Sequence, residues 1–323
     1  MLTFRLRIPT LALLLGASIA VFPLHAPASS LDPDSTGLHS APPRTDSVTS
    51  VGKEQAARDS SVSPEHLMPF SGWKVINLPT GRTLEQGNWL FLISHRFNQA
   101  VNVGYSGFYG LDSGATMDLS LGYAFTDRLL ATVSRSDLQD NVELETRYGI
   151  VHETAPDSPV GLSVQGSLNW RTQKVRGESR WRSERVTYTG QVTLTRTIAG
   201  QLGFALVPGV TLNPSPDLEG EAPILTLGLG GRWKLQEKLA LVGEWTPILS
   251  RPDEIVGRSN RYSTWAAGVE VTTAGHVFQI VASNNLGLST NQYLGGGDLN
   301  GDVFDGAFRL GFNIFRILDF SKF

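Results

Sequence analysis

Cysteine is absent from the 323 residues, and its absence removes several kinds of chemistry at once. A chain without thiols has no disulfide, no thiolate metal site, no cysteine nucleophile and no lipid-modified cysteine. Charged residues make up only 18%, the formal net charge is −3, and no basic stripe favours binding to nucleic acid. The mean hydropathy of −0.08 is too low for a bundle of membrane helices. It is compatible with a membrane β-barrel, in which apolar and polar residues cancel in any average.

Residues 1–26 have the order of a secretory signal peptide. Two arginines precede an apolar run, and the small residue Ala26 follows it, so we expect cleavage near Ala26. A retained helical anchor is the alternative. Pro9 and Pro23, however, leave an uninterrupted apolar stretch shorter than the ~20 residues that a spanning helix needs. The sequence therefore predicts export.

The composition divides the remaining chain into segments. Residues 27–69 are mainly Ser, Pro, Asp, Thr, Gly and Ala, with too few large apolar groups to offset the entropy of ordering, so we predict a disordered periplasmic leader. Residues 70–86 regain large apolar residues around Pro79-Thr80-Gly81. We expect this short segment to be ordered and to dock on the barrel or in its mouth. A barrel is predicted for residues 87–318, followed by a tail at 319–323.

From residue 87 onward, apolar side chains recur at every second position. In residues 115–125, for example, Met117 and Leu119 alternate with Asp118 and Ser120. Successive side chains of a strand point to opposite faces, so each such strand has one apolar face and one small or polar face. About twelve strands are predicted, at residues 87–98, 115–125, 129–137, 141–151, 160–171, 185–196, 202–212, 223–234, 239–249, 261–271, 276–285 and 306–318.

The predicted fold class is all-β, a closed antiparallel transmembrane β-barrel of about twelve strands. Long and tight connections mostly alternate, which is typical of extracellular loops and periplasmic turns and puts both termini on the periplasmic side. A periplasmic β-sandwich or lipocalin-like barrel is the soluble alternative, but it needs bulky residues inside. Aromatic residues near strand ends indicate interfacial girdles: Trp89, Tyr123, Trp170, Trp233, Trp245 and Trp265.

Several short sequence motifs follow one another along the chain: Val75-Ile76-Asn77, Thr83-Leu84-Glu85-Gln86-Gly87, Ile93-Ser94-His95-Arg96-Phe97, Gly110-Leu111-Asp112, Thr126-Asp127-Arg128, Gly275-His276-Val277-Phe278-Gln279 and Leu310-Gly311-Phe312-Asn313-Ile314-Phe315-Arg316. Together they resemble a family of predicted bacterial outer-membrane β-barrels classified as a domain of unknown function. The resemblance covers about residues 70–318. It implies a barrel of unassigned activity and carries over no catalytic residues.

Charged residues with lumen-facing parity form the main candidate site: Arg96, Asp118, Glu143, Glu145, Arg147 and Arg309. One interpretation is a charged constriction that selects small polar solutes, since rings of charged side chains set pore selectivity. The other is that these residues pair on the inner wall and fill a narrow barrel. The inward-facing Leu90, Leu92, Val207 and Val242 favour a partly plugged lumen, filled by residues 70–84.

Catalysis and calcium binding have weaker support. His95 has outward parity, and the facing strands offer leucine and phenylalanine instead of a serine nucleophile, so no catalytic residue is proposed. Asp298, Asn300 and Asp302 resemble half of a calcium loop, but Arg309 stands where the closing glutamate belongs. The alternative is a glycine-rich surface loop.

We therefore expect a monomeric barrel in the bacterial outer membrane, in contact with outer-membrane lipid and lipopolysaccharide, with no cofactor and no nucleic-acid partner. The expected activity is that of a narrow channel or a binding barrel for a small solute, and not of an enzyme. A structural or surface-contact protein with a plugged lumen is the alternative. An outer-membrane hydrolase is a further alternative function.

Overall fold

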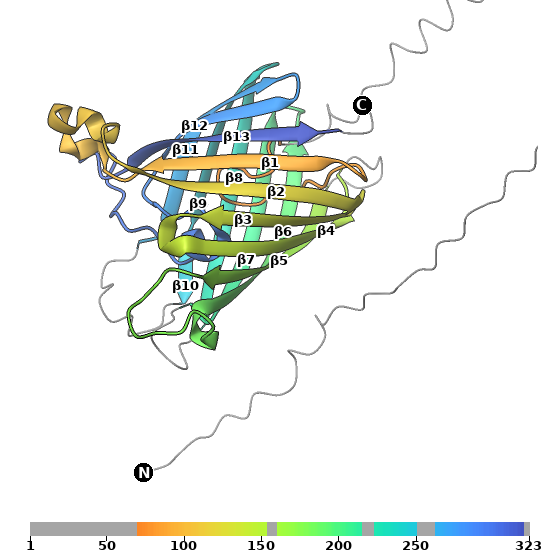
Figure 1. The fold of residues 1–323 in the computed structure, drawn as a ribbon. Helices are drawn as coiled ribbons and strands as arrows, with labels where there is room; N and C mark the ends of the chain where they lie inside the picture. The colour runs from red at the N-terminus through yellow and green to blue at the C-terminus, as the bar shows by residue number, and fades with distance from the viewer. Residues whose placement is uncertain (1–69, 154–159, 215–222, 251–261, 320–323) are drawn as a thin grey trace, which may run out of the picture. The chain divides into compact units, whose positions relative to one another are not determined.

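The computed structural model describes residues 70–153, 160–214, 223–250 and 262–319 (Figure 1). The predicted signal peptide, the predicted leader and all but the first residue of the predicted tail lie outside these residues. Within the described part of the chain, no helix is both long and apolar enough to cross a membrane.

In these described ranges, thirteen strands form one antiparallel sheet. They are β1 (Trp89–Phe97), β2 (Ala115–Thr126), β3 (Leu129–Ser136), β4 (Asn141–Val151), β5 (Gly161–Arg171), β6 (Val186–Ile198), β7 (Leu202–Leu212), β8 (Ile224–Gln236), β9 (Leu239–Thr246), β10 (Ile248–Ser250), β11 (Thr264–Thr273), β12 (His276–Ser283) and β13 (Arg309–Leu318). The first strand pairs with the last, Trp89 opposite Leu318, so the sheet closes on itself (Figure 1). The predicted closed barrel of twelve antiparallel strands is confirmed, with β10 as an additional short strand.

Two predicted boundaries are wrong for identifiable reasons. The run predicted as one strand at 239–249 divides at Pro247, which has no N–H to donate to the ladder. The chain continues as β10 against β8, with Ile248 opposite Thr226. The last strand begins at Arg309 instead of 306, because residues 303–306 form a turn, and the Gly306 and Phe308 carbonyls accept N–H groups of the 98–114 connection.

The outer wall of the barrel is apolar and its inner wall is mostly polar. On β2 the outward-facing Leu119 is 44% exposed, whereas the inward-facing Asp118 and Ser120 are 2% and 4% exposed. A continuous belt of exposed leucine, valine and phenylalanine is stable where lipid replaces water. The aromatic residues predicted for the girdles lie near strand ends, Trp89 and Trp233 at one end of the barrel and Trp170 and Trp245 at the other.

The two ends of the barrel differ in their connections. Tight turns join β2 to β3, β6 to β7, β8 to β9 and β11 to β12 at one end, which we call the turn end. The long connections at 98–114, 172–185 and 284–308 lie at the other, which we call the loop end. The first of them contains two 3-10 helices, η2 (Val101–Val103) and η3 (Tyr105–Gly110), which project beyond the strands in Figure 1.

Candidate functional site

Residues 70–86, called the plug below, lie inside the barrel and fill much of its lumen. The plug contacts inward-facing side chains on β1, β4, β8, β9, β12 and β13, which surround it. Six of its apolar side chains are at most 4% exposed: Phe70, Trp73, Val75, Ile76, Leu78 and Leu84. At about 1.5–3 kcal/mol for each buried side chain, this burial contributes on the order of 10 kcal/mol to holding the plug in place.

The centre of the plug is a small hairpin with a tight turn. Its two arms are joined by the bridge between Lys74 and Pro79, and the Val75 N–H donates to the Leu78 carbonyl at 2.8 Å. Thr80 fixes the base of the hairpin, because its hydroxyl donates to the Gly72 and Trp73 carbonyls at 3.1 and 3.0 Å. A turn of this kind leaves successive backbone N–H groups pointing the same way, which forms a concave site for an anion.

Glu244 on β9 supplies that anion from the barrel wall. Its carboxylate accepts the backbone N–H groups of Ile76, Asn77 and Leu78 at 2.9–3.1 Å and the side-chain amide of Asn77 at 2.7 Å. Glu244 is 7% exposed. Hydrogen bonds to an ionised acceptor are worth about 1.5–3 kcal/mol each, so this one side chain is a major anchor of the plug.

A second set of polar contacts holds the opposite side of the turn. Asn313 on β13 donates its amide to the Ile76 carbonyl at 3.1 Å, and Gln279 on β12 donates to the Val75 carbonyl at 2.7 Å. Arg96 on β1 donates to Asn313 at 3.1 Å and to Asn77 at 3.3 Å. The buried polar groups of the turn thus have partners on several strands, as burial requires.

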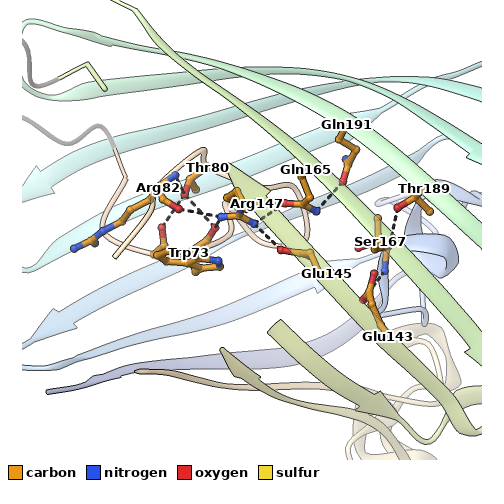
Figure 2. A network of polar contacts seen from close by, with 12 residues as sticks. Trp73, Thr80, Arg82, Glu143, Glu145, Arg147, Gln165, Ser167, Thr189 and Gln191 are labelled. Atoms are coloured by element: carbon orange, nitrogen blue, oxygen red, sulfur yellow. Dashed lines mark hydrogen bonds and ion pairs between the residues drawn. The ribbon is translucent and has the colours of Figure 1, made fainter. Parts of the chain in front are cut away.

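Arg147 on β4 anchors the arms of the hairpin (Figure 2). Its guanidinium donates to the Trp73 and Arg82 carbonyls at 3.2 and 3.3 Å and lies 4.9 Å from the Trp73 ring centroid. It also donates to Gln165 at 2.7 Å and forms an ion pair with Glu145 at 3.2 Å. Figure 2 shows these bonds converging on Arg147, so the charge is neutralised and fully hydrogen-bonded within the wall.

Glycines on β8 make room for the plug. A Cβ atom added to Gly228 would lie 2.6 Å from the Leu78 Cδ2 atom, and one added to Gly230 would lie 2.9 Å from the Val75 Cγ2 atom. These glycines let the hairpin pack directly against the sheet backbone. A side chain at either position would therefore conflict with the plug.

The connection between β12 and β13 closes the lumen from the loop end. Its short helix α2 (Thr290–Leu294) is inserted between the strands, with Tyr293 1% exposed. The Tyr293 hydroxyl donates to Gln191 on β6 at 3.0 Å, and the Thr290 N–H donates to the Glu143 carboxylate at 3.2 Å. Tyr293 and Leu294 join the plug in one apolar cluster, so both insertions fill the same lumen.

All six charged residues of the predicted cluster face inward and are at most 7% exposed. They do not form one ring. Arg96 and Arg147 bind the plug, Glu145 pairs with Arg147, and Glu143 binds α2. The Asp118 carboxylate accepts the hydroxyls of Ser120 and Ser134, and Arg309 pairs with Asp298 at 2.6 Å.

The calcium candidates are engaged within the chain. The Asp298 carboxylate is held by Arg309, and the Asn300 and Asp302 side chains accept backbone N–H groups of their own loop. Among the described residues, no group of three or more histidines and acidic residues is placed to hold a metal ion.

His95, the histidine considered for catalysis, faces outward on β1. The His95 ring stacks on Phe312, with ring centroids 4.6 Å apart. His152 follows the end of β4, and its pKa is lowered by burial and by the nearby Arg128, which favours a neutral ring at pH 7.

Sequence reasoning did not single out the anchors Glu244, Arg232 and Glu270. Arg232 on β8 and Glu270 on β11 form a buried ion pair at 2.7 Å, and Arg232 also donates to the Ser71 hydroxyl. The sequence does contain a feature that could have identified Glu244. Glu244 follows Ala240 and Val242 at inward-facing positions, and a carboxylate next to such apolar inward-facing residues requires a buried partner.

A cavity of about 360 Å³ lies between the plug and the turn end. Its lining is chemically mixed. Aromatic side chains line it at Phe70, Trp73 and Phe315, and the charged lining residues are Arg82, Arg232, Lys234, Lys238 and Glu237. Trp73 Nε1, Thr197 Oγ1 and Thr272 Oγ1 are buried atoms of lining residues that have no hydrogen-bond partner in the described part of the chain.

The closed sheet, its apolar outer belt and its filled interior define a membrane-spanning β-barrel with an internal plug. The chain belongs to the family described as "Membrane bound beta barrel domain (DUF5777)", whose family model matches residues 70–318. This confirms the resemblance on which the sequence-based expectation rested.

Solved structures of similar fold are bacterial outer-membrane barrels. An outer-membrane channel from Pseudomonas putida F1 is 13% identical, with 73% of this chain and 97% of that one covered and a TM-score of 0.46. A NanC porin is 10% identical, with coverages of 71% and 98% and a TM-score of 0.43. A KdgM porin is 9% identical, with coverages of 72% and 99% and a TM-score of 0.42. The comparison with curated proteins gave no match.

Proposed function

We propose that the protein resides in the bacterial outer membrane as a monomer and binds a small amphipathic anion in a plugged barrel, without forming an open pore. The pairing of β1 with β13 and of β8 with β9 closes the ring of twelve strands within one chain, which supports a single chain as the unit. The hydrocarbon-facing belt and the girdles support residence in the membrane. Binding takes place in the cavity at the turn end.

The filled lumen argues against an open pore. In a water-filled channel the inward-facing side chains would be hydrated, whereas Arg96, Arg147 and Gln279 are at most 1% exposed. Full expulsion of the plug would also expose Val207, Val242 and Phe315 on the inner wall to water. We therefore expect purified wild-type protein to be silent in planar bilayers.

The mixed chemistry of the turn-end cavity carries the proposal. Its volume is in the range of small-molecule pockets, about 300–1,000 Å³. The aromatic side chains would hold a flat apolar body, while Lys234 and Lys238 would hold an anionic group. Aromatic carboxylates combine both properties, so they are the class of solute to test.

The first prediction tests this cavity with 2-naphthoate and its neutral isostere 2-naphthamide. We expect wild-type barrel to bind the anion at least tenfold more tightly than the amide, measured by calorimetry in a non-ionic detergent. The Lys234→Gln/Lys238→Gln variant should lose about tenfold in affinity for naphthoate, the equivalent of one charge-assisted hydrogen bond.

The control for this experiment removes two cations from the outer wall near the same end. Arg196 and Arg316 are exposed and face away from the lumen, so the Arg196→Gln/Arg316→Gln variant should bind naphthoate like wild type. Equal affinity for naphthoate and naphthamide, or an equal loss in both double variants, would contradict the proposal.

A surface-contact role is the second candidate, and exposed aromatic residues at the loop end favour it. Tyr105 is 82% exposed and Phe304 is completely exposed, at 101%. Their loops are joined, because the Val101 and Asn102 N–H groups donate to the Phe308 and Gly306 carbonyls at 2.8 and 3.1 Å. Exposed aromatic surface of this kind marks contact sites.

A second prediction follows for this role. If the loop-end aromatics mediate contact between cells, bacteria displaying a Tyr105→Ser/Phe304→Ser variant should sediment more slowly than cells displaying wild type at the same surface density. Sedimentation at the wild-type rate would exclude this role for these two residues.

A further inference from the structure

The loop between β5 and β6, residues 172–185, carries an excess of positive charge outside the lumen. It contains five cations, Lys174, Arg176, Arg180, Arg182 and Arg185, and two carboxylates, Glu178 and Glu184. Both carboxylates are used within the loop: Arg185 pairs with Glu178 at 2.7 Å and Arg182 pairs with Glu184 at 3.1 Å. Three exposed cations, Lys174, Arg176 and Arg180, remain without a carboxylate partner in the described part of the chain.

Glu184 neutralises Arg182 across the physiological pH range. The hydrogen bond from its own backbone, followed by those from Arg182 and Ser183, lowers the pKa of this carboxyl group. The excess charge of the loop is therefore confined to Lys174, Arg176 and Arg180.

Two tryptophans fix the loop at the membrane interface. Trp170, on the outer face near the end of β5, stacks on Trp181 with ring centroids 4.6 Å apart, and its indole N–H donates to the Arg180 carbonyl at 2.9 Å. Trp181 is itself 80% exposed. Tryptophan is enriched where the headgroup region of a membrane meets its hydrocarbon core. The contact with Trp170 thus holds Arg180 at headgroup level.

Apolar side chains of the outer belt continue below this pair. Leu168 on β5 lies opposite Tyr188 on β6, and both are exposed on the outer wall, at 38% and 50%. A molecule bound here would contact the lipid-facing side chains of β5 and β6 and also the cations of residues 172–185. This is the arrangement that a phosphorylated lipid requires, with acyl chains on the belt and phosphate at the loop.

We propose that residues 172–185 bind the phosphate groups of lipopolysaccharide in the outer leaflet, with Lys174, Arg176 and Arg180 as the phosphate ligands and Trp181 packed against the lipid. Arginine matches phosphate oxygens through its planar guanidinium group. A soluble partner would not require the stacked tryptophans at the level of the girdle. The site is independent of the cavity at the turn end, so either proposal can fail alone.

The experiment measures binding of deep-rough lipopolysaccharide to the full-length barrel in non-ionic detergent, with the same lipopolysaccharide after enzymatic dephosphorylation as the comparison. The Lys174→Gln/Arg176→Gln/Arg180→Gln variant should bind the phosphorylated form about 10- to 100-fold more weakly than wild type. Trp181→Ala should weaken binding less, by about fivefold. Raising the salt concentration should weaken wild-type binding and have little effect on the triple variant.

The matched control removes three exposed cations at the turn end, as Arg128→Gln/Arg196→Gln/Arg316→Gln, and should bind lipopolysaccharide like wild type. Far-ultraviolet circular dichroism and heat-dependent gel migration establish that each variant is folded. An equal loss in the two triple variants would show a general charge effect and overturn the site. Undiminished binding of dephosphorylated lipopolysaccharide, or equally tight binding of phosphatidylglycerol vesicles, would overturn the assignment to lipopolysaccharide phosphate.

Discussion

Replacing Glu244 with alanine is expected to destabilise the barrel by about 3–5 kcal/mol and to allow ion conduction through a lumen that is otherwise closed. The substitution leaves the backbone N–H groups of Ile76, Asn77 and Leu78 buried without their acceptor. Unsatisfied buried donors are costly, so the turn of the plug should leave the wall and seek water. Denaturant titration in detergent measures the stability, and single-channel recording in planar bilayers measures the conductance.

The conservative variant and a matched control sharpen this test. Glu244→Gln retains one carbonyl oxygen as an acceptor. It should therefore lower the stability by less than half as much as Glu244→Ala, and it should conduct only rarely. Glu85→Ala removes a carboxylate from an exposed position at the end of the plug and should change neither quantity. If Glu244→Ala proves as stable and as silent as wild type, the carboxylate does not anchor the plug.

The plug has two kinds of attachment with different consequences for function. Apolar packing against Val207 and Val242 is strong but non-directional, whereas the bonds from Glu244, Gln279 and Asn313 fix the position of the turn. Loss of a polar anchor should therefore loosen the turn while the apolar arms still hold the segment in the barrel. The expected conductance is small and intermittent for this reason.

Much of the fold was predictable because it depends on a local pattern. Alternation of residues such as Leu119 and Ser120 reports which side of a strand faces lipid, and it needs no knowledge of the partner strand. Turn residues such as Thr126, whose hydroxyl accepts the Arg128 and Leu129 N–H groups, mark where one strand ends and the next begins. Two strand ends were harder to predict. At Pro247 the missing N–H donor interrupts the strand, and before Arg309 a turn that bonds to another loop delays its start.

The candidate site was predictable only in part. Inward parity identified Arg96 and Arg147 as lumen-facing, but parity does not tell whether an inward charge meets water, another wall residue or an inserted segment. Arg147 bonds to carbonyls at Trp73 and Arg82, which are 74 and 65 residues away in sequence. Contacts of this range depend on the closed barrel and leave no local signature.

Helix α2 illustrates the same limit. The stretch around Gly295 and Asp298 is typical of a surface loop by composition, yet Tyr293 is buried in the lumen and bonded to Gln191. The sequence does contain one clue, because Tyr293 and Leu294 are adjacent large apolar residues in an otherwise glycine-rich connection. A buried destination for them requires a lumen wide enough to admit a helical turn, and the strand count sets that width.

Introducing valine at Gly228 is expected to displace the plug by steric conflict, without removing any anchor. A Cβ atom at this position would lie 2.6 and 2.9 Å from the two methyl carbons of Leu78 and 3.2 Å from the Val207 Cβ atom. Overpacking of this kind costs about 1–3 kcal/mol or more, and the sheet backbone is less able to move than the plug. We expect Gly228→Val to lower the stability by at least about 2 kcal/mol and to give intermittent conductance.

Gly231 provides the matched control, because a Cβ atom added there has no heavy atom within 4 Å. Gly231→Val should be neutral or slightly stabilising, since valine favours a strand and the position faces outward. A double-mutant cycle with Leu78→Ala then identifies the conflict: the Leu78→Ala/Gly228→Val variant should be at least about 1 kcal/mol more stable than the sum of the single effects predicts. Strict additivity would mean that valine at 228 acts through β8 alone, and that the glycines of this strand do not accommodate the plug.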